Sequence, residues 1–384
     1  MVRISDILKQ GGHFSQPDKP EKEKKEEEAP VEEAISSSGQ DSQESPASGI
    51  QFSKAMSTEG RSPAEKEIQV AGAMHKMQID PAESLNIYNQ ALKVITQILN
   101  RAQSDEPLDL KEAYGIVKVI TDRLILGDKE LISLTANHES NSAQDNYLYS
   151  HCVNICVLSI YLGFGLGYNK SKLHELGLGA LLHDLGMIKV MEVAGQPRVL
   201  NEREFEEIKK HPLYSSDFLK KVKEVQEGVI YIAEQAHERF GGQGYPRGLK
   251  DDEIHAYAKI AAVVDVYEAL THGRPYRKAL QPHEAIKELL AMNSSGLFDM
   301  SLLKALINRM GIYPVGCWVE LNSSEIGKVV STNDDSPLRP KVNIIFGPTK
   351  DRLPQIKSID LSAKPNLFIK RSINPQELDL KLDS

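Results

Sequence analysis

The hydrophobic positions over 64–310 recur mostly at helical spacing. Ile116, Ile120 and Leu124 are four residues apart and therefore fall on one face of a helix. Other segments of this kind follow along the chain, separated by short polar connections. The pattern predicts a mainly α protein built as a helical bundle.

The C-terminal part has a different pattern. Short apolar runs at 317–321, 328–330 and 341–346 are separated by Asn, Ser, Gly and Pro residues, which is typical of strands joined by turns. We therefore predict a small β-rich domain over 311–384. Its role stays open, and a purely structural cap on the helices is one reading.

The N-terminal part is strongly polar. Residues 16–63 contain a Lys/Glu block and then a Ser-, Gln- and Gly-rich stretch with almost no aromatic residues. Such a segment cannot bury enough apolar area to offset the entropy lost on ordering, so it is predicted to be disordered. The predicted organisation is a disordered leader over 1–63, an N-terminal helical unit over 64–140, a central helical domain over 141–310 and the β-rich domain over 311–384. The helical unit has no catalytic signature and is either regulatory or a cap.

Charge and composition exclude some functions. The 384 residues carry a formal net charge of -8, which argues against general nucleic-acid binding because such proteins use clustered positive charge. A small anionic ligand held by a metal is compatible with this charge. The sequence shows no apolar signal-peptide core and no run of about 18 apolar residues. We therefore expect a cytoplasmic protein without a membrane span.

Cysteine usage agrees with a reducing compartment. The chain has three cysteines, too few for a disulfide framework. Cys152 and Cys156 are four residues apart in an apolar run, where a ligand pair or a redox pair is one reading. Small buried core residues are the favoured reading.

Six histidine and aspartate residues form the candidate site. They are His151, His183, Asp184, His211, His237 and Asp265. Apart from the tandem pair, they follow one another at intervals of 26 to 32 residues, about one helix plus a connection. Five successive helices can therefore each project one such side chain inward, as in the metal sites of helical bundles.

The two aspartates fall on apolar stripes. Asp184 follows Leu173 and Ala180 on one helical face, and Asp265 follows Ala261 on another. A buried carboxylate without a partner costs several kcal/mol, so both positions call for a cation. Imidazole and carboxylate are natural ligands of a divalent metal. An ordinary core histidine is the better reading of any one position alone, but the tandem pair and the regular spacing favour a metal site.

Several motifs occur in the order of a known family. They are His151, Ala180-Leu181-Leu182-His183-Asp184-Leu185-Gly186, His211-Pro212, His237-Glu238-Arg239-Phe240, Gly244-Tyr245-Pro246, Val264-Asp265-Val266-Tyr267-Glu268-Ala269-Leu270 and Arg274-Pro275-Tyr276-Arg277. On these motifs, roughly 146–291 resembles the HD-GYP branch of the HD phosphohydrolase superfamily. The resemblance implies a five-helix HD core with two extra helices and a centre of two or three metal ions, often iron or manganese. It also implies hydrolysis of cyclic di-GMP, first to linear pGpG and sometimes onward to GMP.

The resemblance assigns roles to individual residues. His183 and Asp184 would be catalytic as well as metal ligands, because a bound metal supplies hydroxide near neutral pH. Arg274 and Arg277 would bind the phosphate or guanine edges of the substrate, since guanidinium groups suit both; a surface pair at a helix end is equally open. The Gly244-Tyr245-Pro246 loop would contact a GGDEF-type diguanylate cyclase through an exposed tyrosine. A packed turn that shapes the wall of the site is the alternative.

The sequence departs from the family pattern at four positions. Met187 replaces the usual lysine after His-Asp-x-Gly, and Ala236 replaces the first of two histidines before Glu-Arg. Tyr147 stands where three-metal members have a glutamate, and Gly241 replaces the aspartate that opens the Asp-Gly-x-Gly-Tyr-Pro run. Lys189 lies two residues after Met187, about 200° around a helix, so it is not expected to substitute.

The departures leave one metal set complete. That set is His151, His183, Asp184 and Asp265. The second set keeps Asp184 as a bridge with two histidines but lacks one imidazole, so one or two ions are expected, iron or manganese. Loss of a single well-placed electrostatic group commonly costs about 3 kcal/mol in catalysis.

Three functions therefore stay open. The first is an active cyclic di-GMP phosphodiesterase. The second is a degenerate, weakly active or inactive HD-GYP protein that binds a nucleotide or a signalling partner. The third is an HD hydrolase of another phosphate ester, which the Gly-Tyr-Pro run disfavours by analogy. The sequence leaves the metal, the input signal and the oligomeric state undetermined.

Overall fold

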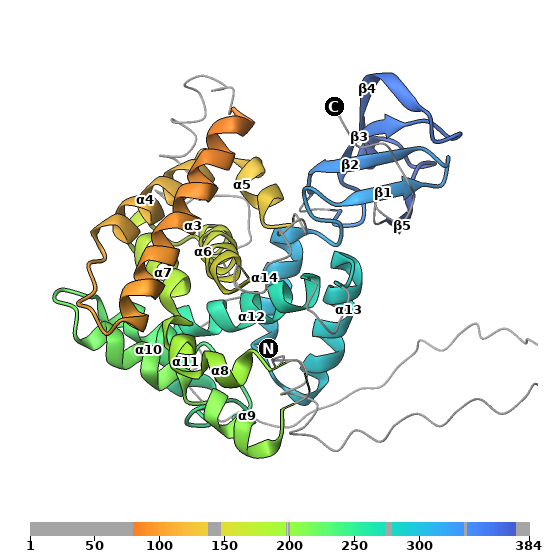
Figure 1. The fold of residues 1–384 in the computed structure, drawn as a ribbon. Helices are drawn as coiled ribbons and strands as arrows, with labels where there is room; N and C mark the ends of the chain where they lie inside the picture. Colours follow the sequence, from red (N-terminus) through yellow and green to blue (C-terminus); the bar gives the residue numbers. More distant parts are fainter. Residues whose placement is uncertain are drawn as a thin grey trace, which may run out of the picture.

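The computed structural model describes residues 80–373 except 137–146, 197, 199, 273–278 and 334–335. The described part is mainly helical, with a small antiparallel sheet at its C-terminal end (Figure 1). This architecture confirms the predicted fold class. The predicted leader lies outside the described residues.

The helices form two groups along the chain. The N-terminal group is α3 (Pro81–Gln103), α4 (Lys111–Ile125) and α5 (Lys129–Leu134). The second group is α6 (Tyr147–Gly165), α7 (Lys170–Leu182), the 3-10 helix η2 (Leu185–Val190), α8 (Met191–Ala194), α9 (Glu202–Ile208), α10 (His211–Lys220), α11 (Glu227–Gln235), α12 (Ala256–Thr271), α13 (Pro282–Met292) and α14 (Met300–Met310). Many begin at a side-chain cap, as α3 does where Asp80 accepts a hydrogen bond from the backbone N–H of Ala82.

Helix α6 is the central element of the bundle. Its residues are buried almost without interruption from His151 to Gly163, and α3, α7, α12 and α14 pack around it (Figure 1). By length and composition it is the one helix among the described residues that is apolar enough to cross a membrane. However, 78% of its most apolar stretch is buried inside the protein, which is the environment of a core helix.

One hydrophobic core joins the two groups of helices. Ile95 of α3 and Ile120 of α4 belong to the same buried cluster as Ile155 of α6 and Leu289 of α13. The N-terminal helices therefore gain their stability from the same core that holds the central helices together. The predicted boundary near residue 140 falls among residues that the structure does not describe.

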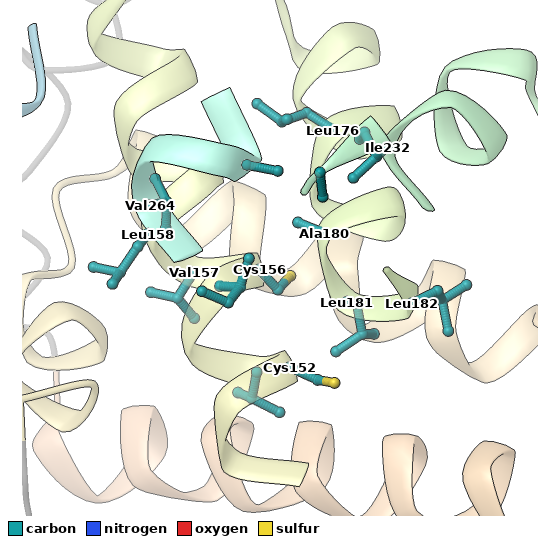
Figure 2. Close-up of a cluster of buried hydrophobic side chains, with 14 of the residues drawn as sticks. Cys152, Cys156, Val157, Leu158, Leu176, Ala180, Leu181, Leu182, Ile232 and Val264 are labelled. Atoms are coloured by element: carbon teal, nitrogen blue, oxygen red, sulfur yellow. The ribbon is translucent and has the colours of Figure 1, made fainter. Parts of the chain in front are cut away.

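The cysteines of α6 are core residues. In Figure 2, Cys152 and Cys156 lie among the apolar side chains of α6 and α7, with Ile232 of α11 and Val264 of α12 nearby. Both thiols are free and fully buried. Burial raises the pKa of each thiol above its ordinary value. The prediction of small core residues rather than a redox pair is confirmed.

The C-terminal sheet has five antiparallel strands in the order β4-β3-β2-β1-β5. The strands are β1 (Trp318–Leu321), β2 (Ile326–Ser331), β3 (Lys341–Phe346), β4 (Arg352–Asp360) and β5 (Ile369–Ser372). The sheet has its own small core, which includes Val319, Val329 and Ile344. It lies to one side of the bundle, next to α13 and α14 (Figure 1).

Candidate metal centre

The six candidate residues come from separate elements of the bundle. They are His151 in α6, His183 and Asp184 at the C-terminal end of α7, His211 at the start of α10, His237 just after α11, and Asp265 in α12. All six are buried. The structure brings all six side chains together, although two short helices, α8 and α9, separate Asp184 from His211 along the chain.

Asp184 is at the centre of the cluster. Its Oδ1 lies 3.2 Å from Nε2 of His211, 3.2 Å from Nε2 of His237 and 3.4 Å from Nε2 of His183. Its Oδ2 lies 3.7 Å from Nε2 of His151. One carboxylate therefore faces four imidazoles, which is the arrangement expected of a bridging ligand.

Asp265 in α12 also faces the histidines of the cluster. Its Oδ1 lies 3.5 Å from Nε2 of His151, and its Oδ2 lies 3.5 Å from Nδ1 of His237. In each of two groups of three residues, the possible ligand atoms all lie within 4.8 Å of one another. The groups are His151, His183 and Asp265, and His183, Asp184 and His237. Each group is compact enough to surround one ion.

The second ring nitrogens show which way the imidazoles face. Nδ1 of His183 donates to the carbonyl oxygen of Ala180 at 2.8 Å, and Nδ1 of His211 donates to that of Ile208 at 2.8 Å. These bonds leave the Nε2 lone pairs directed into the cluster. Those two Nε2 atoms and both carboxylate oxygens of Asp265 are buried without hydrogen-bond partners. Buried acceptors without donors are costly, and a divalent cation would satisfy all four, so the residues fit a metal.

The charges of the cluster also favour a cation. Burial alone would raise the pKa of Asp184, but the surrounding histidines hold it well below its ordinary value. Burial alone would lower the pKa of His237, but the neighbouring carboxylates of Asp184 and Asp265 raise it to about 9. The carboxylates therefore stay ionised in the interior and hold positive charge beside them.

The turn after the tandem pair requires glycine. A Cβ added at Gly186 would lie 2.1 Å from the backbone oxygen of His211 and 2.5 Å from the backbone nitrogen of Ser215. The backbone N–H of Gly186 donates to Oγ of Ser215 at 2.7 Å. This close approach holds α10 against η2 and so brings His211 to Asp184.

The prediction that Tyr245 is an exposed anchor is wrong. Its side chain is 7% exposed, and its ring stacks on His237 with centroids 5.1 Å apart and planes at 6°. Its ring also meets His211 edge-on at 6.0 Å. The loop reaches this depth because Gly244 passes so close to Glu238 that a Cβ would lie 2.4 Å from its Cα. The alternative of a packed turn that forms a wall of the site describes the structure, and contact of the loop with a GGDEF-type cyclase stays a prediction.

The structure shows the surroundings of three of the four departures from the family pattern, Met187, Ala236 and Tyr147. Met187 is packed in the main core and Ala236 is fully buried. Lys189 points to the surface, where its Nζ lies 2.8 Å from Oδ1 of Asp105, so the expectation that it does not replace the missing lysine is confirmed. Tyr147 stacks on His151 with ring centroids 5.7 Å apart. A phenol therefore stands where three-metal members have a carboxylate.

The two predicted substrate-binding residues, Arg274 and Arg277, lie outside the described residues. Their role in holding phosphate or guanine stays a prediction.

Sequence reasoning missed a carboxylate that supports the cluster. Nδ1 of His151 donates to Oε2 of Glu268 at 2.7 Å, and Glu268 is fully buried in α12. Nδ2 of Asn154 donates to its Oε1 at 3.0 Å, and the hydroxyl of Tyr147 donates to its Oε2 at 3.3 Å. The available signal was spacing, because Glu268 follows Asp265 by three residues and shares its helical face.

Comparisons with known proteins agree with this geometry. Residues 129–302 match the family model of the HD domain, and residues 318–381 match a KOW domain associated with the HD domain. A cyclic di-GMP phosphodiesterase of Pseudomonas aeruginosa is 32% identical over 67% of this chain and 61% of its own length. The cyclic di-GMP phosphodiesterase PdeB of Borreliella burgdorferi is 30% identical over 61% of this chain and 62% of its own.

A solved structure shares the fold. An HDGYP protein of Bdellovibrio bacteriovorus matches with a TM-score of 0.50 and 18% identity, over 63% of this chain and 76% of that one. The helical bundle that carries the buried His–Asp cluster therefore has the fold of an HD domain. The names of these relatives and of this structure agree with the resemblance to HD-GYP proteins that the motifs predicted. The chain spans about three fifths of the length of the curated relatives that it matches.

Proposed function

We propose that this chain is a metal-dependent phosphodiesterase that hydrolyses cyclic di-GMP to pGpG and onward to GMP. The observation that carries the proposal is the buried cluster in which Asp184 faces four imidazoles and Asp265 presents two oxygens without hydrogen-bond partners. The names of the curated relatives support the choice of substrate.

The cluster offers two overlapping sets of ligands. The first ion would be held by His151, His183, Asp184 and Asp265. The second would be held by Asp184, His211 and His237. Iron or manganese is proposed, because both suit mixed imidazole and carboxylate ligands. A bound ion lowers the pKa of a coordinated water and so supplies hydroxide near neutral pH.

Other residues of the chain prepare the cluster for this role. Tyr245 covers His211 and His237 from one side, which fixes the two rings and keeps bulk water away from that face. The backbone carbonyls that accept from His183 and His211 hold both rings in the tautomer with a free Nε2. Arg274 and Arg277 are proposed to bind the substrate, because guanidinium groups pair with phosphate oxygens.

A second candidate function rests on two positions. Met187 and Ala236 replace a lysine and a histidine of the family pattern, and both side chains are buried. A protein that lacks both groups would bind a cyclic dinucleotide or a signalling partner and turn over slowly. The two functions differ in turnover rather than in the presence of the site.

The deciding experiment measures metal content and hydrolysis on the same anaerobically purified sample. About two ions per chain with formation of pGpG would support the enzyme, and loss of both in Asp184→Ala would tie them to the cluster. Tight binding of cyclic di-GMP without turnover, across iron, manganese and nickel, would favour the second candidate. Cyclic di-AMP and 3′3′-cyclic GMP-AMP assayed in parallel would show whether the guanine bases select the substrate.

A further inference from the structure

A chain of hydrogen bonds runs from the N-terminal helix α3 to the cluster. The hydroxyl of Tyr88 in α3 donates to Oδ1 of Asn154 at 2.7 Å. Nδ2 of Asn154 donates to Oε1 of Glu268 at 3.0 Å. Oε2 of Glu268 accepts from Nδ1 of His151 at 2.7 Å. Three side chains on three helices therefore connect α3 to a predicted metal ligand.

The polarity of this chain is fixed by chemistry. Glu268 is fully buried and Asn154 is 2% exposed. The NH₂ of Asn154 faces Glu268 and can only donate, and its oxygen faces Tyr88 and can only accept. The Tyr88 hydroxyl is then the donor that satisfies that oxygen. Burial and the nearby Glu268 raise the pKa of Tyr88, so this donor keeps its proton.

The far end of the chain acts on the imidazole of His151. A carboxylate that accepts from Nδ1 holds the proton there and leaves Nε2 free. This is the side of the ring that lies 3.7 Å from Oδ2 of Asp184 and 3.5 Å from Oδ1 of Asp265. Such a partner also fixes the plane of the ring and makes the ligand more basic.

We propose that Tyr88, Asn154 and Glu268 are positioning residues for His151, so that α3 is a functional part of the metal site. The inference rests on the proposed function, because it assumes that His151 binds a metal. Of the two readings of the N-terminal helices, a regulatory unit or a cap, the inference favours the regulatory one. Displacement of α3 would release Asn154, loosen Glu268 and weaken metal binding by His151. If α3 only packed against the other helices as a cap, its side chains would have no influence on metal affinity.

The test is a double-mutant cycle read out as the dissociation constant for Mn²⁺ of the full chain. Tyr88→Phe removes one hydroxyl from a half-buried ring, and Glu268→Gln removes the charge while keeping the shape. Tyr114→Phe is the matched control, because the hydroxyl of Tyr114 in α4 also donates at 2.7 Å to a side-chain amide oxygen, that of Gln226, away from the cluster. Circular dichroism melts check that all variants fold.

Glu268→Gln is expected to weaken Mn²⁺ binding by about 10- to 100-fold, the usual effect of removing the partner of a ligating histidine. Tyr88→Phe is expected to weaken it about fivefold, the size of one hydrogen bond, and Tyr114→Phe to leave it unchanged. Because Tyr88 acts through Glu268, its effect should disappear in the Glu268→Gln background.

Two results would overturn the inference. One is a Tyr88→Phe protein with the Mn²⁺ affinity of the Tyr114→Phe control, and the other is full additivity in the double mutant. Hydrolysis of cyclic di-GMP on the same samples separates this inference from the proposed function. Mn²⁺ binding with the expected cycle but without turnover refutes only the proposed function. Turnover with an unperturbed cycle refutes only the coupling, and a wild-type protein that binds neither Mn²⁺ nor Fe²⁺ refutes both.

Discussion

Asp184→Asn tests the cluster at its centre. The substitution keeps the size of the side chain and removes the charge from a group that lies within 3.7 Å of four imidazole nitrogens. An ion bound here would lose its shared anionic ligand, and the amide NH₂ would point at Nε2 atoms or at the ion. We expect Mn²⁺ binding to be lost or to weaken by at least two orders of magnitude.

The expected size of the effect follows from ligand linkage. A metal present at 100 times its dissociation constant stabilises the folded state by about 2.7 kcal/mol. For a domain of this size, 1 kcal/mol corresponds to about 2–4 °C in melting temperature. Wild-type protein should therefore melt roughly 5–11 °C higher with Mn²⁺ at that concentration than without it, and the Asp184→Asn protein should show almost no difference.

The assay is a thermal melt at a series of Mn²⁺ concentrations. Comparing each protein with and without metal removes any change in the intrinsic stability of the variant. Asp217→Asn is the matched control, because Asp217 is exposed on α10 and should keep the full metal-dependent shift. A wild-type shift that persists unchanged in Asp184→Asn would refute the assignment of the metal to this cluster.

Three further substitutions test the surroundings of the site. Gly186→Ala should lower the free energy of unfolding, measured by urea denaturation, by about 3 kcal/mol, because the added Cβ would meet the backbone of His211. Gly115→Ala is the control: this glycine has open space around it, so the substitution should raise the free energy of unfolding by about 0.5–1 kcal/mol. Tyr245→Ala should lower the free energy of unfolding by about 3 kcal/mol and should also weaken Mn²⁺ binding. Tyr245→Phe keeps the stacked ring and should keep the Mn²⁺ affinity. Equal Mn²⁺ affinities in the two variants would contradict a role for the ring. Met187→Lys should lower the melting temperature more than Met187→Leu, because it places an ammonium in the core; equal melting temperatures would show that this position has access to the site or to solvent.

The sequence was most informative about the candidate cluster. The near-regular spacing of His151, His183, His211, His237 and Asp265 was enough to expect that they face one another, and all of them do. Spacing works here because a helix and its connection have nearly constant length, so one inward position per helix repeats along the chain. The same spacing did not reveal the residues that support the cluster.

The sheet shows where local patterns were insufficient. The apolar runs predicted three strands, which correspond to β1, β2 and β3. The sequence did not reveal β4, whose residues are mostly exposed at the edge of the sheet, or the short β5. An exposed edge strand has no buried face and so leaves no alternation of apolar and polar residues.

The sequence alone was enough to predict the helical bundle, the six residues of the cluster and the positions that depart from the HD-GYP pattern. The contacts between elements were needed to show that Tyr245 packs on His237 instead of facing solvent, that Glu268 holds His151, and that Tyr88 of α3 reaches the same network. These features depend on contacts between segments far apart in the chain, and on the direction in which each side chain leaves its helix. Hydrophobic periodicity specifies which face of an element is buried, but it does not specify which other element that face meets.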